Sequence, residues 1–183
     1  MRVIAGTAKG VRLASVPPGV RPVSDRAREG LFSSIGAVVP GADVLDLYAG
    51  TGALGIEALS RGADRATFVE QSRAALRTIH QNLDRTRLAE RAEVVASEVS
   101  AFVSRRRDPG RRSDLVLADP PYDADVAAVE GVLESLSDGW VQAGGAVALT
   151  RGSRSFTPVI PVHWLVARRL EYGDTAVLIL REA

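Results

Sequence analysis

The tetrapeptide Asp119-Pro120-Pro121-Tyr122 combines groups that suit chemistry on an amine. An exocyclic amine of a nucleobase is a weak nucleophile, because its lone pair is delocalised into the ring. The Asp119 carboxylate and the Pro120 carbonyl can both accept hydrogen bonds from such an amine, which favours a tetrahedral nitrogen and its developing positive charge. The two prolines restrict φ and hold that carbonyl in place, and Tyr122 offers a ring on which an extruded base can stack. We predict that these four residues form a catalytic site for methyl transfer to a base amine; the alternative is a stiff turn with a buried Tyr122.

A glycine-rich loop lies upstream, in Asp46-Leu47-Tyr48-Ala49-Gly50-Thr51-Gly52-Ala53-Leu54-Gly55. Gly50 and Gly52 let the backbone approach a ligand closely. Such a loop alone would also suit NAD. Asp46, however, ends the preceding strand, where its carboxylate can meet the ammonium of a methionine moiety, whereas a pyrophosphate gives little reason for an anion there. The pattern favours S-adenosylmethionine as cofactor; the alternative for Asp46 is a helix cap in a plain strand-to-helix turn.

Two further acidic residues follow the next strands along the chain. Glu70 lies 20 residues after Gly50 and is expected to hold ribose hydroxyls. Glu98 stands where many methyltransferases have Gly-Asp and contact the adenine amino group; it can substitute for that acid, or serve only as an acid at a helix N-terminus. The predicted cofactor-binding residues are Asp46, Tyr48, Ala49, Gly50, Thr51, Gly52, Glu70, Gln71, Ser97 and Glu98.

Short apolar runs alternate with helical patterns from residue 42 onward. The expected strands are residues 44–48, 66–69, 93–95, 115–118 and 146–150, followed by an antiparallel pair at 164–170 and 176–180. The expected helices between them are residues 54–61, 72–86, 99–106 and 126–136. This alternation predicts an α/β, Rossmann-like class I methyltransferase fold, with a mostly parallel seven-stranded sheet and helices on both faces.

The first 40 residues differ in pattern from the rest. Residues 1–23 predict one or two short strands with turns, and a helix is expected from Ser24 or Asp25 to about residue 38. We therefore expect a small N-terminal β-hairpin and helix over residues 1–40, followed by a methyltransferase domain over residues 41–183.

Composition and charge narrow the class of protein. The 183 residues include no cysteine, which excludes disulfides, thiolate metal sites and the covalent cytosine C5 methyltransferases. His80 and His163 have no partner at ligand spacing, so no metal is expected. No stretch is long and apolar enough for a membrane span and the start lacks the apolar core of a signal peptide, so we expect a cytoplasmic protein.

Positive charge is concentrated at the N-terminus. Residues 1–35 carry six basic and two acidic side chains, a net of +4 in a chain whose total is +1, and such asymmetry indicates nucleic-acid contact. The alternatives are a solvated surface, or pairing of Arg26 and Arg28 with Asp25 and Glu29. The predicted RNA-binding residues are Lys9, Arg12, Arg21, Arg26 and Arg28.

Together with both motifs, an N-terminal signature makes the chain resemble the RsmD family, the bacterial 16S ribosomal RNA guanine-N2 methyltransferases. The signature comprises Arg2-Val3-Ile4-Ala5-Gly6, Gly10-Val11-Arg12-Leu13 and Arg21-Pro22-Val23-Ser24-Asp25-Arg26-Ala27-Arg28-Glu29, then Leu31-Phe32. The resemblance implies methylation of N2 of one guanine in 16S ribosomal RNA within the 30S particle, with the N-terminal hairpin and helix facing the RNA. Ser97-Glu98 departs from the usual pattern. We expect a monomer.

Three competing functions remain. A DNA adenine-N6 methyltransferase can use the same tetrapeptide and loop, but this small chain has no room for a separate DNA-recognition domain. A catalytically silent RNA-binding assembly factor would not need the intact tetrapeptide. An NAD-dependent enzyme is disfavoured by Asp46.

Overall fold

The computed structural model describes residues 1–14, 23–105, 112–121, 123–155 and 157–182. The strands in this part of the chain are β1 (Asp43–Leu47), β2 (Arg65–Glu70), β3 (Ala92–Ala96), β4 (Ser113–Ala118), β5 (Val141–Gly152), β6 (Trp164–Tyr172) and β7 (Thr175–Glu182). The helices are α1 (Asp25–Ser34), α2 (Ala53–Ser60), α3 (Arg73–Thr86), α4 (Val99–Val103) and α5 (Val126–Ser137), with a 3-10 helix η1 (Ala89–Arg91) before β3.

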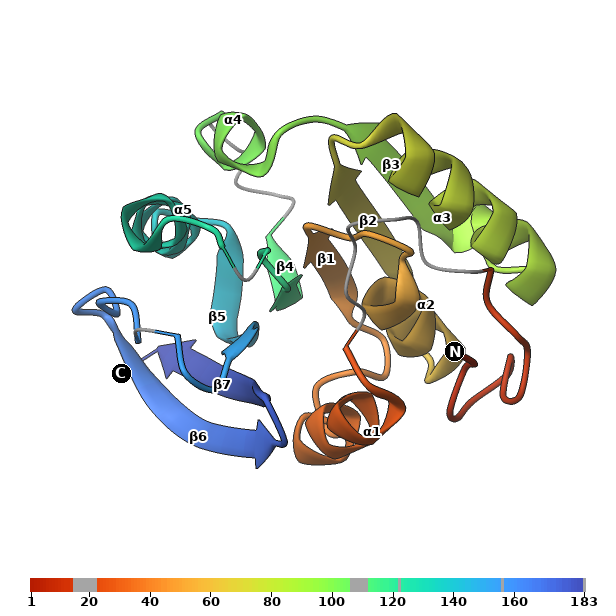
Figure 1. The fold of residues 1–183 in the computed structure, drawn as a ribbon, viewed down its shortest axis with the longest axis horizontal. Helices are drawn as coiled ribbons and strands as arrows, with labels where there is room; N and C mark the ends of the chain where they lie inside the picture. The colour runs from red at the N-terminus through yellow and green to blue at the C-terminus, as the bar shows by residue number, and fades with distance from the viewer. Residues whose placement is uncertain (15–22, 106–111, 122, 156, 183) are drawn as a thin grey trace.

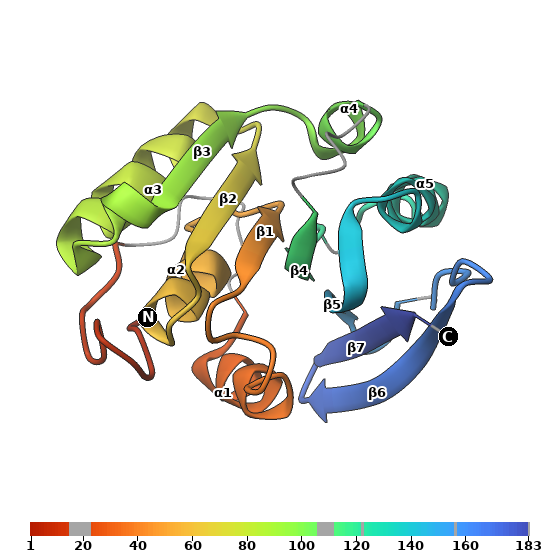
Figure 2. The same cartoon turned by 180° about the vertical axis from the view of Figure 1, so that it is seen from behind.

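The strands form one seven-stranded sheet in the order β3-β2-β1-β4-β5-β7-β6 (Figures 1 and 2). Strands β1 to β5 pair in parallel, whereas β7 lies antiparallel to both β5 and β6. The strand order reverses between β1 and β4, and ligands of open α/β sheets bind beyond the carboxyl ends of the strands at such a point. The predicted class I methyltransferase fold is confirmed.

Helices cover both faces of the sheet (Figures 1 and 2). Val44 belongs to a core formed with apolar residues of α1, α2 and α3, whereas its neighbour Leu45 belongs to a second core formed with α4 and α5. The two cores are separate because successive side chains of a strand point to opposite faces. Burial of both faces also explains why the central strands β1, β4 and β7 are mostly apolar runs rather than alternating ones.

The N-terminal segment, residues 1–14, packs against α2 and α3. The carboxylate of Glu57 in α2 accepts hydrogen bonds from the backbone N–H groups of Ile4 (2.8 Å) and Ala5 (3.0 Å). Val3 and Leu13 are buried in the same core as α1, α2 and α3. The segment therefore packs into the same core as the fold that follows it. The division at residue 40 expected from the sequence separates two stretches of chain that share this core.

Several expected boundaries differ from those observed. Within residues 1–14 the antiparallel pairing is a single bridge between Arg2 and Arg12 rather than a strand pair. Helix α1 ends at Ser34, because Ile35 leaves the helical conformation and the poor helix former Gly36 follows it. Strand β5 begins at Val141, earlier than expected, and its pairing with β4 is irregular between Ser113 and Leu115. In the described residues, no helix has the length and apolar character needed to cross a membrane.

Candidate active site

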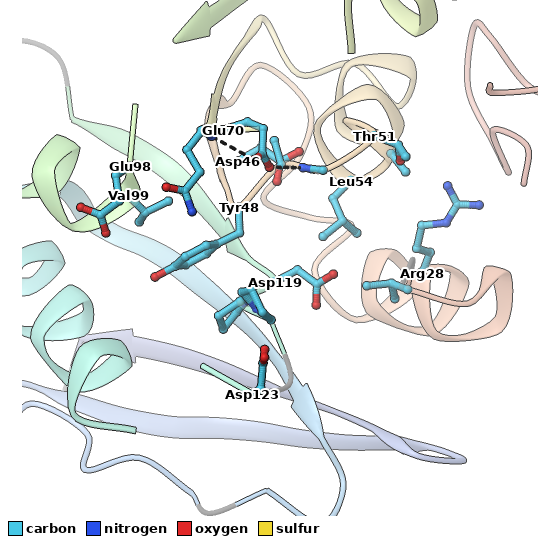
Figure 3. Close-up of a pocket in the computed structure, with 17 residues that line it drawn as sticks. Arg28, Asp46, Tyr48, Thr51, Leu54, Glu70, Glu98, Val99, Asp119 and Asp123 are labelled. Carbon is cyan, nitrogen blue, oxygen red and sulfur yellow. Dashed lines mark hydrogen bonds between the residues drawn. The ribbon is translucent and has the colours of Figure 1, made fainter. Parts of the chain in front are cut away.

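A cavity of about 340 Å³ lies beyond the carboxyl ends of β1, β2, β3 and β4 (Figure 3). This volume is in the range of small-molecule sites, roughly 300–1,000 Å³. Most of the predicted cofactor and catalytic residues line it: Asp46, Tyr48, Ala49, Gly50, Thr51, Glu70, Gln71, Glu98, Asp119, Pro120 and Pro121. The structure therefore brings together residues from four separate segments of the sequence.

The glycine loop has a left-handed backbone where it leaves β1. Tyr48 and Gly50 both have φ of 57°, and Gly52, the N-cap of α2, has φ of 75°. Tyr48 is one of two described non-glycine residues with positive φ, a conformation that is retained mostly where the surrounding structure requires it. The Gly50 N–H donates to the Oε2 atom of Glu70 over 2.9 Å, which ties the loop to the end of β2.

Asp46 lies at the base of the cavity. Its Oδ2 atom accepts a hydrogen bond from the Gly55 N–H in the first turn of α2 (2.9 Å), so the carboxylate holds the helix while it lines the cavity. Burial raises the pKa of Asp46 well above its usual value, and the nearby carboxylates of Asp119 and Glu70 raise it further. A cationic ligand group would relieve this concentration of negative charge.

Asp119 follows β4 directly, and its N–H donates to the Leu47 carbonyl (3.3 Å), which holds the start of the tetrapeptide beside β1. Burial raises the pKa of Asp119 to about 7. Pro120 is buried, and Pro121 is exposed while its carbonyl accepts the Ala124 N–H (3.0 Å). The Asp119 carboxyl can therefore both bind and release a proton near neutral pH. Tyr122, predicted to stack on the base, lies outside the described residues.

Glu70 and Glu98 each have a local structural role as well as a place in the cavity. The Oε1 atom of Glu70 accepts from the N–H groups of Gln71 and Ser72. Glu98 is the N-cap of α4 and accepts from Ser100 and from the Ala101 N–H, contacts that lower its pKa. Both carboxylates supply acceptor oxygens at the cavity wall, suited to hydroxyl or amino donors.

Some predicted residues lie outside the cavity wall. Gly52 shapes the loop as the N-cap of α2, and the Ser97 hydroxyl donates to the Glu98 carbonyl. Lys9, Arg12 and Arg26 are exposed on the surface, and Arg21 lies outside the described residues.

Arg28 was predicted as a surface phosphate contact, but its side chain is fully buried and lines the cavity. The reason is its position on α1, where the spacing of residues 28, 31, 32 and 35 places it on the helix face that packs into the core. That spacing is the signal that could have distinguished it from the exposed Arg26. The other lining residues that sequence reasoning missed are Val23, Ala53, Leu54, Val99 and Asp123.

The fold and the cavity together define a class I methyltransferase fold, for which the sequence predicts S-adenosylmethionine as cofactor. The cofactor carries a sulfonium and an ammonium, and the cavity wall supplies carboxylates from Asp46, Glu70, Glu98, Asp119 and Asp123. The left-handed Gly50 loop supplies backbone that a ligand can approach closely. The residues present therefore fit the cofactor in charge and shape.

Comparison with known proteins identifies the family. The family described as "Conserved hypothetical protein 95" matches residues 1–181. Ribosomal RNA small subunit methyltransferase D of Escherichia coli (strain K12) is 36% identical over 187 residues, covering 100% of this chain and 91% of the relative. Putative rRNA methyltransferase YlbH of Bacillus subtilis is 38% identical over 186 residues, covering 100% and 99%. The solved structure of putative methyltransferase yhhF from Escherichia coli has a TM-score of 0.86 and 33% identity, covering 100% of this chain and 97% of that one. The chain belongs to this family, the RsmD family, as the sequence motifs indicated.

Proposed function

We propose that the protein transfers a methyl group from S-adenosylmethionine to the exocyclic N2 of one guanine in 16S ribosomal RNA within the 30S particle. The observation that carries this proposal is the half-buried Asp119 carboxylate in the cavity; Asp119 follows β4, its N–H donates to β1, and the Pro120 backbone lies beside it. Its relative in Escherichia coli is a small-subunit ribosomal RNA methyltransferase. A ribosomal RNA substrate also supports action in the cytoplasm, and we propose a monomeric enzyme.

S-adenosylmethionine, when bound, supplies an electrophilic methyl group, whose bond to sulfur breaks as the bond to the amine nitrogen forms. The residues of this chain then have two tasks. The Asp119 carboxylate and the Pro120 carbonyl accept hydrogen bonds from the N2 amine, which orients its lone pair. Asp119 also takes the proton that the methylated nitrogen releases, a role that suits a carboxyl group with a pKa of about 7.

The cofactor's adenosine and methionine parts are assigned to different ends of the cavity. We propose that Glu70 accepts from the ribose hydroxyls and Glu98 from the adenine amino group, with Asp46 facing the ammonium. Tyr122 is proposed to stack on the flipped guanine. Exposed Lys9, Arg12 and Arg26, together with Arg21, are proposed to contact RNA phosphates.

Transfer of labelled methyl groups to 30S particles that lack the modification tests the proposal. We expect N2-methylguanosine with the wild-type protein and a loss of about 100-fold or more with Asp119→Asn, because the amide cannot take the proton. The control is Asp138→Asn, an exposed acid after α5, whose activity should equal that of the wild type.

Three outcomes would contradict the proposal in different ways. Another methylated base would retain the mechanism but overturn the choice of guanine N2. Transfer to duplex DNA rather than to 30S particles would favour an adenine-N6 methyltransferase. Cofactor binding without transfer to 30S particles, naked RNA or DNA would favour a silent assembly factor.

A further inference from the structure

A second basic region lies in the C-terminal part of the chain. Residues 139–170 contain four arginines and no acidic residue, a net charge of +4 that equals the charge of residues 1–35. The arginines are Arg151, Arg154, Arg168 and Arg169. The cofactor site does not account for this charge, because the described residues that line the cavity include none of these four.

Arg154 lies in a tight turn directly beyond β5. The Ser155 N–H donates to the Gly152 carbonyl over 2.9 Å and closes this turn. Strand β5 is parallel to β4, and Ala118 at the end of β4 pairs with Leu149. The turn therefore lies beyond the edge of the sheet at which β4 leads into the tetrapeptide, which is also the edge that carries the cavity.

Arg168 lies on β6, beside α1 (Figures 1 and 2). Its Nη1 atom donates to the Ser34 hydroxyl over 3.0 Å. Further along β6, the Tyr172 hydroxyl occupies the space that a β-carbon on Gly30 would need. The strand therefore follows α1 toward the start of the helix, which carries the exposed Arg26 and contributes to the cavity wall.

Two of the four arginines have a charge that is free to bind a partner. Arg154 and Arg168 are exposed, and among the residues that the structure describes neither forms an ion pair with a carboxylate. In contrast, Arg169 pairs with Glu171 over 2.9 Å, and Arg151 is buried. Exposed cations without an acidic partner suit a polyanion, and the phosphates of RNA are contacted mainly by such side chains.

We propose that Arg154 and Arg168 bind phosphates of the RNA substrate and, together with Arg26, hold the RNA on the β5–β6 side of the cavity. Residues 1–14 pack against α2 and α3, whereas β5 and β6 lie on the other side of β1 and β4 (Figures 1 and 2). RNA bound at both surfaces crosses the opening of the cavity, where its target base can reach Asp119. The inference rests on RNA as the substrate proposed above.

Binding to 30S particles that lack the modification, and to protein-free 16S ribosomal RNA, tests the inference. Filter binding at several salt concentrations gives the dissociation constant and its dependence on salt. We expect Arg154→Gln and Arg168→Gln each to weaken binding to both RNAs by about 3- to 10-fold and to reduce the logarithmic salt slope by about one, since one phosphate contact is lost. Arg65→Gln is the matched control: it removes the same charge from the start of β2, at the opposite edge of the sheet, and should bind as wild type.

Lysine variants separate the role of charge from a structural role. Arg154→Lys and Arg168→Lys keep the positive charge, so they should bind RNA within about twofold of wild type. All four variants should bind S-adenosylmethionine with wild-type affinity, because neither residue lines the cavity. Weaker cofactor binding in the glutamine variants, measured by calorimetry, would show a structural role and overturn the inference.

The remaining outcomes distinguish this inference from the proposed function. Wild-type affinity and salt slope in both glutamine variants would overturn the inference alone. Weaker binding to 30S particles with unchanged binding to 16S ribosomal RNA would assign the two arginines to a protein of the particle instead. A wild-type protein that bound neither form of the RNA would overturn the proposed function, and this inference with it.

Discussion

The side-chain amide nitrogen of Asn82 donates a hydrogen bond of 2.9 Å to the carbonyl oxygen of Thr51, joining α3 to the glycine loop. The Oδ1 atom of the same amide accepts the Ala14 N–H over 2.7 Å. Asn82 is fully buried, so water cannot replace either contact. One amide therefore positions both the glycine loop and Ala14 of the N-terminal segment.

The substitution Asn82→Asp should weaken the contacts of residue 82 with Thr51 and Ala14, although the side chain keeps almost the same shape. A carboxylate oxygen would face the Thr51 carbonyl in place of a donor, and the contacts described for this side chain, with Thr51 and Ala14, offer the buried charge no cation. We expect the free energy of unfolding to fall by about 2–4 kcal/mol and cofactor affinity to fall with it. Denaturant unfolding and calorimetry measure the two effects. The neighbouring exposed substitution Gln81→Glu is the control, and equal behaviour of the two variants would contradict the assignment.

The pKa of Asp119, raised to about 7 by burial, predicts the pH dependence of the reaction. The ionised carboxylate is the form that accepts the proton, so the rate should fall as pH falls through 7. We expect kcat/KM to rise about tenfold between pH 6 and pH 8. Stability should respond in the opposite sense. A raised pKa favours the protonated group in the folded state, so the stability it contributes is present below the unfolded-state pKa and is lost as pH rises through 7.

Asp119→Asn separates these effects. The variant should lose the transition near pH 7 from its residual activity, and it should be stabilised relative to wild type more at pH 8 than at pH 5. Thermal unfolding at the two pH values measures the second effect. A wild-type profile with no change between pH 6 and pH 8 would show that another group governs proton release.

Glu57→Gln should release the N-terminal segment selectively. Both carboxylate oxygens of the fully buried Glu57 are used, by the N–H groups of Ile4 and Ala5 and by Arg61. A glutamine supplies only one oxygen, and its amide donors would face another donor. Hydrogen exchange at Ile4 and Ala5 should accelerate by about tenfold or more, corresponding to about 1–3 kcal/mol. Glu134→Gln on the exposed face of α5 should leave exchange at these residues unchanged.

Two glycines within helices predict opposite effects of the same substitution. A β-carbon on Gly55 would overlap Cε1 of the buried Phe68 ring and lie 3.0 Å from Asp46 Oδ2. Gly55→Ala should therefore destabilise the protein by about 1–3 kcal/mol and disturb the cofactor cavity. A β-carbon on Gly131 in α5 would meet nothing within 4 Å, so Gly131→Ala should stabilise by about 0.4–1 kcal/mol. Denaturant unfolding measures the change in the free energy of unfolding for each variant. Changes of the same sign in both variants would contradict the packing described here.

Local pattern was enough to predict the fold class, the glycine loop and the cavity position of Asp119. Each of these depends on a strand end, and parallel strands bring their carboxyl ends to one edge. The burial of Arg28 and the two-sided contacts of Asn82 could not be predicted in the same way, because they depend on which helix packs beside which segment. The N-terminal hairpin is smaller than expected for the same reason: its two arms share one bridge and a few backbone hydrogen bonds, and side chains of α2 and α3 accept further N–H groups of the segment.

The attachment of the N-terminal segment also sets an order of events during biosynthesis. Residues 4, 5, 8 and 14 are synthesised before the side chains that receive their backbone N–H groups, which belong to Glu57, Ser60 and Asn82 and follow 52 to 68 positions later. Long loops must be closed before such contacts contribute. The basic segment of residues 1–14, proposed to face RNA, is therefore made before its partners and is seated only after them, so a newly made chain acquires the surface proposed to bind RNA only after its glycine loop and α3 are in place.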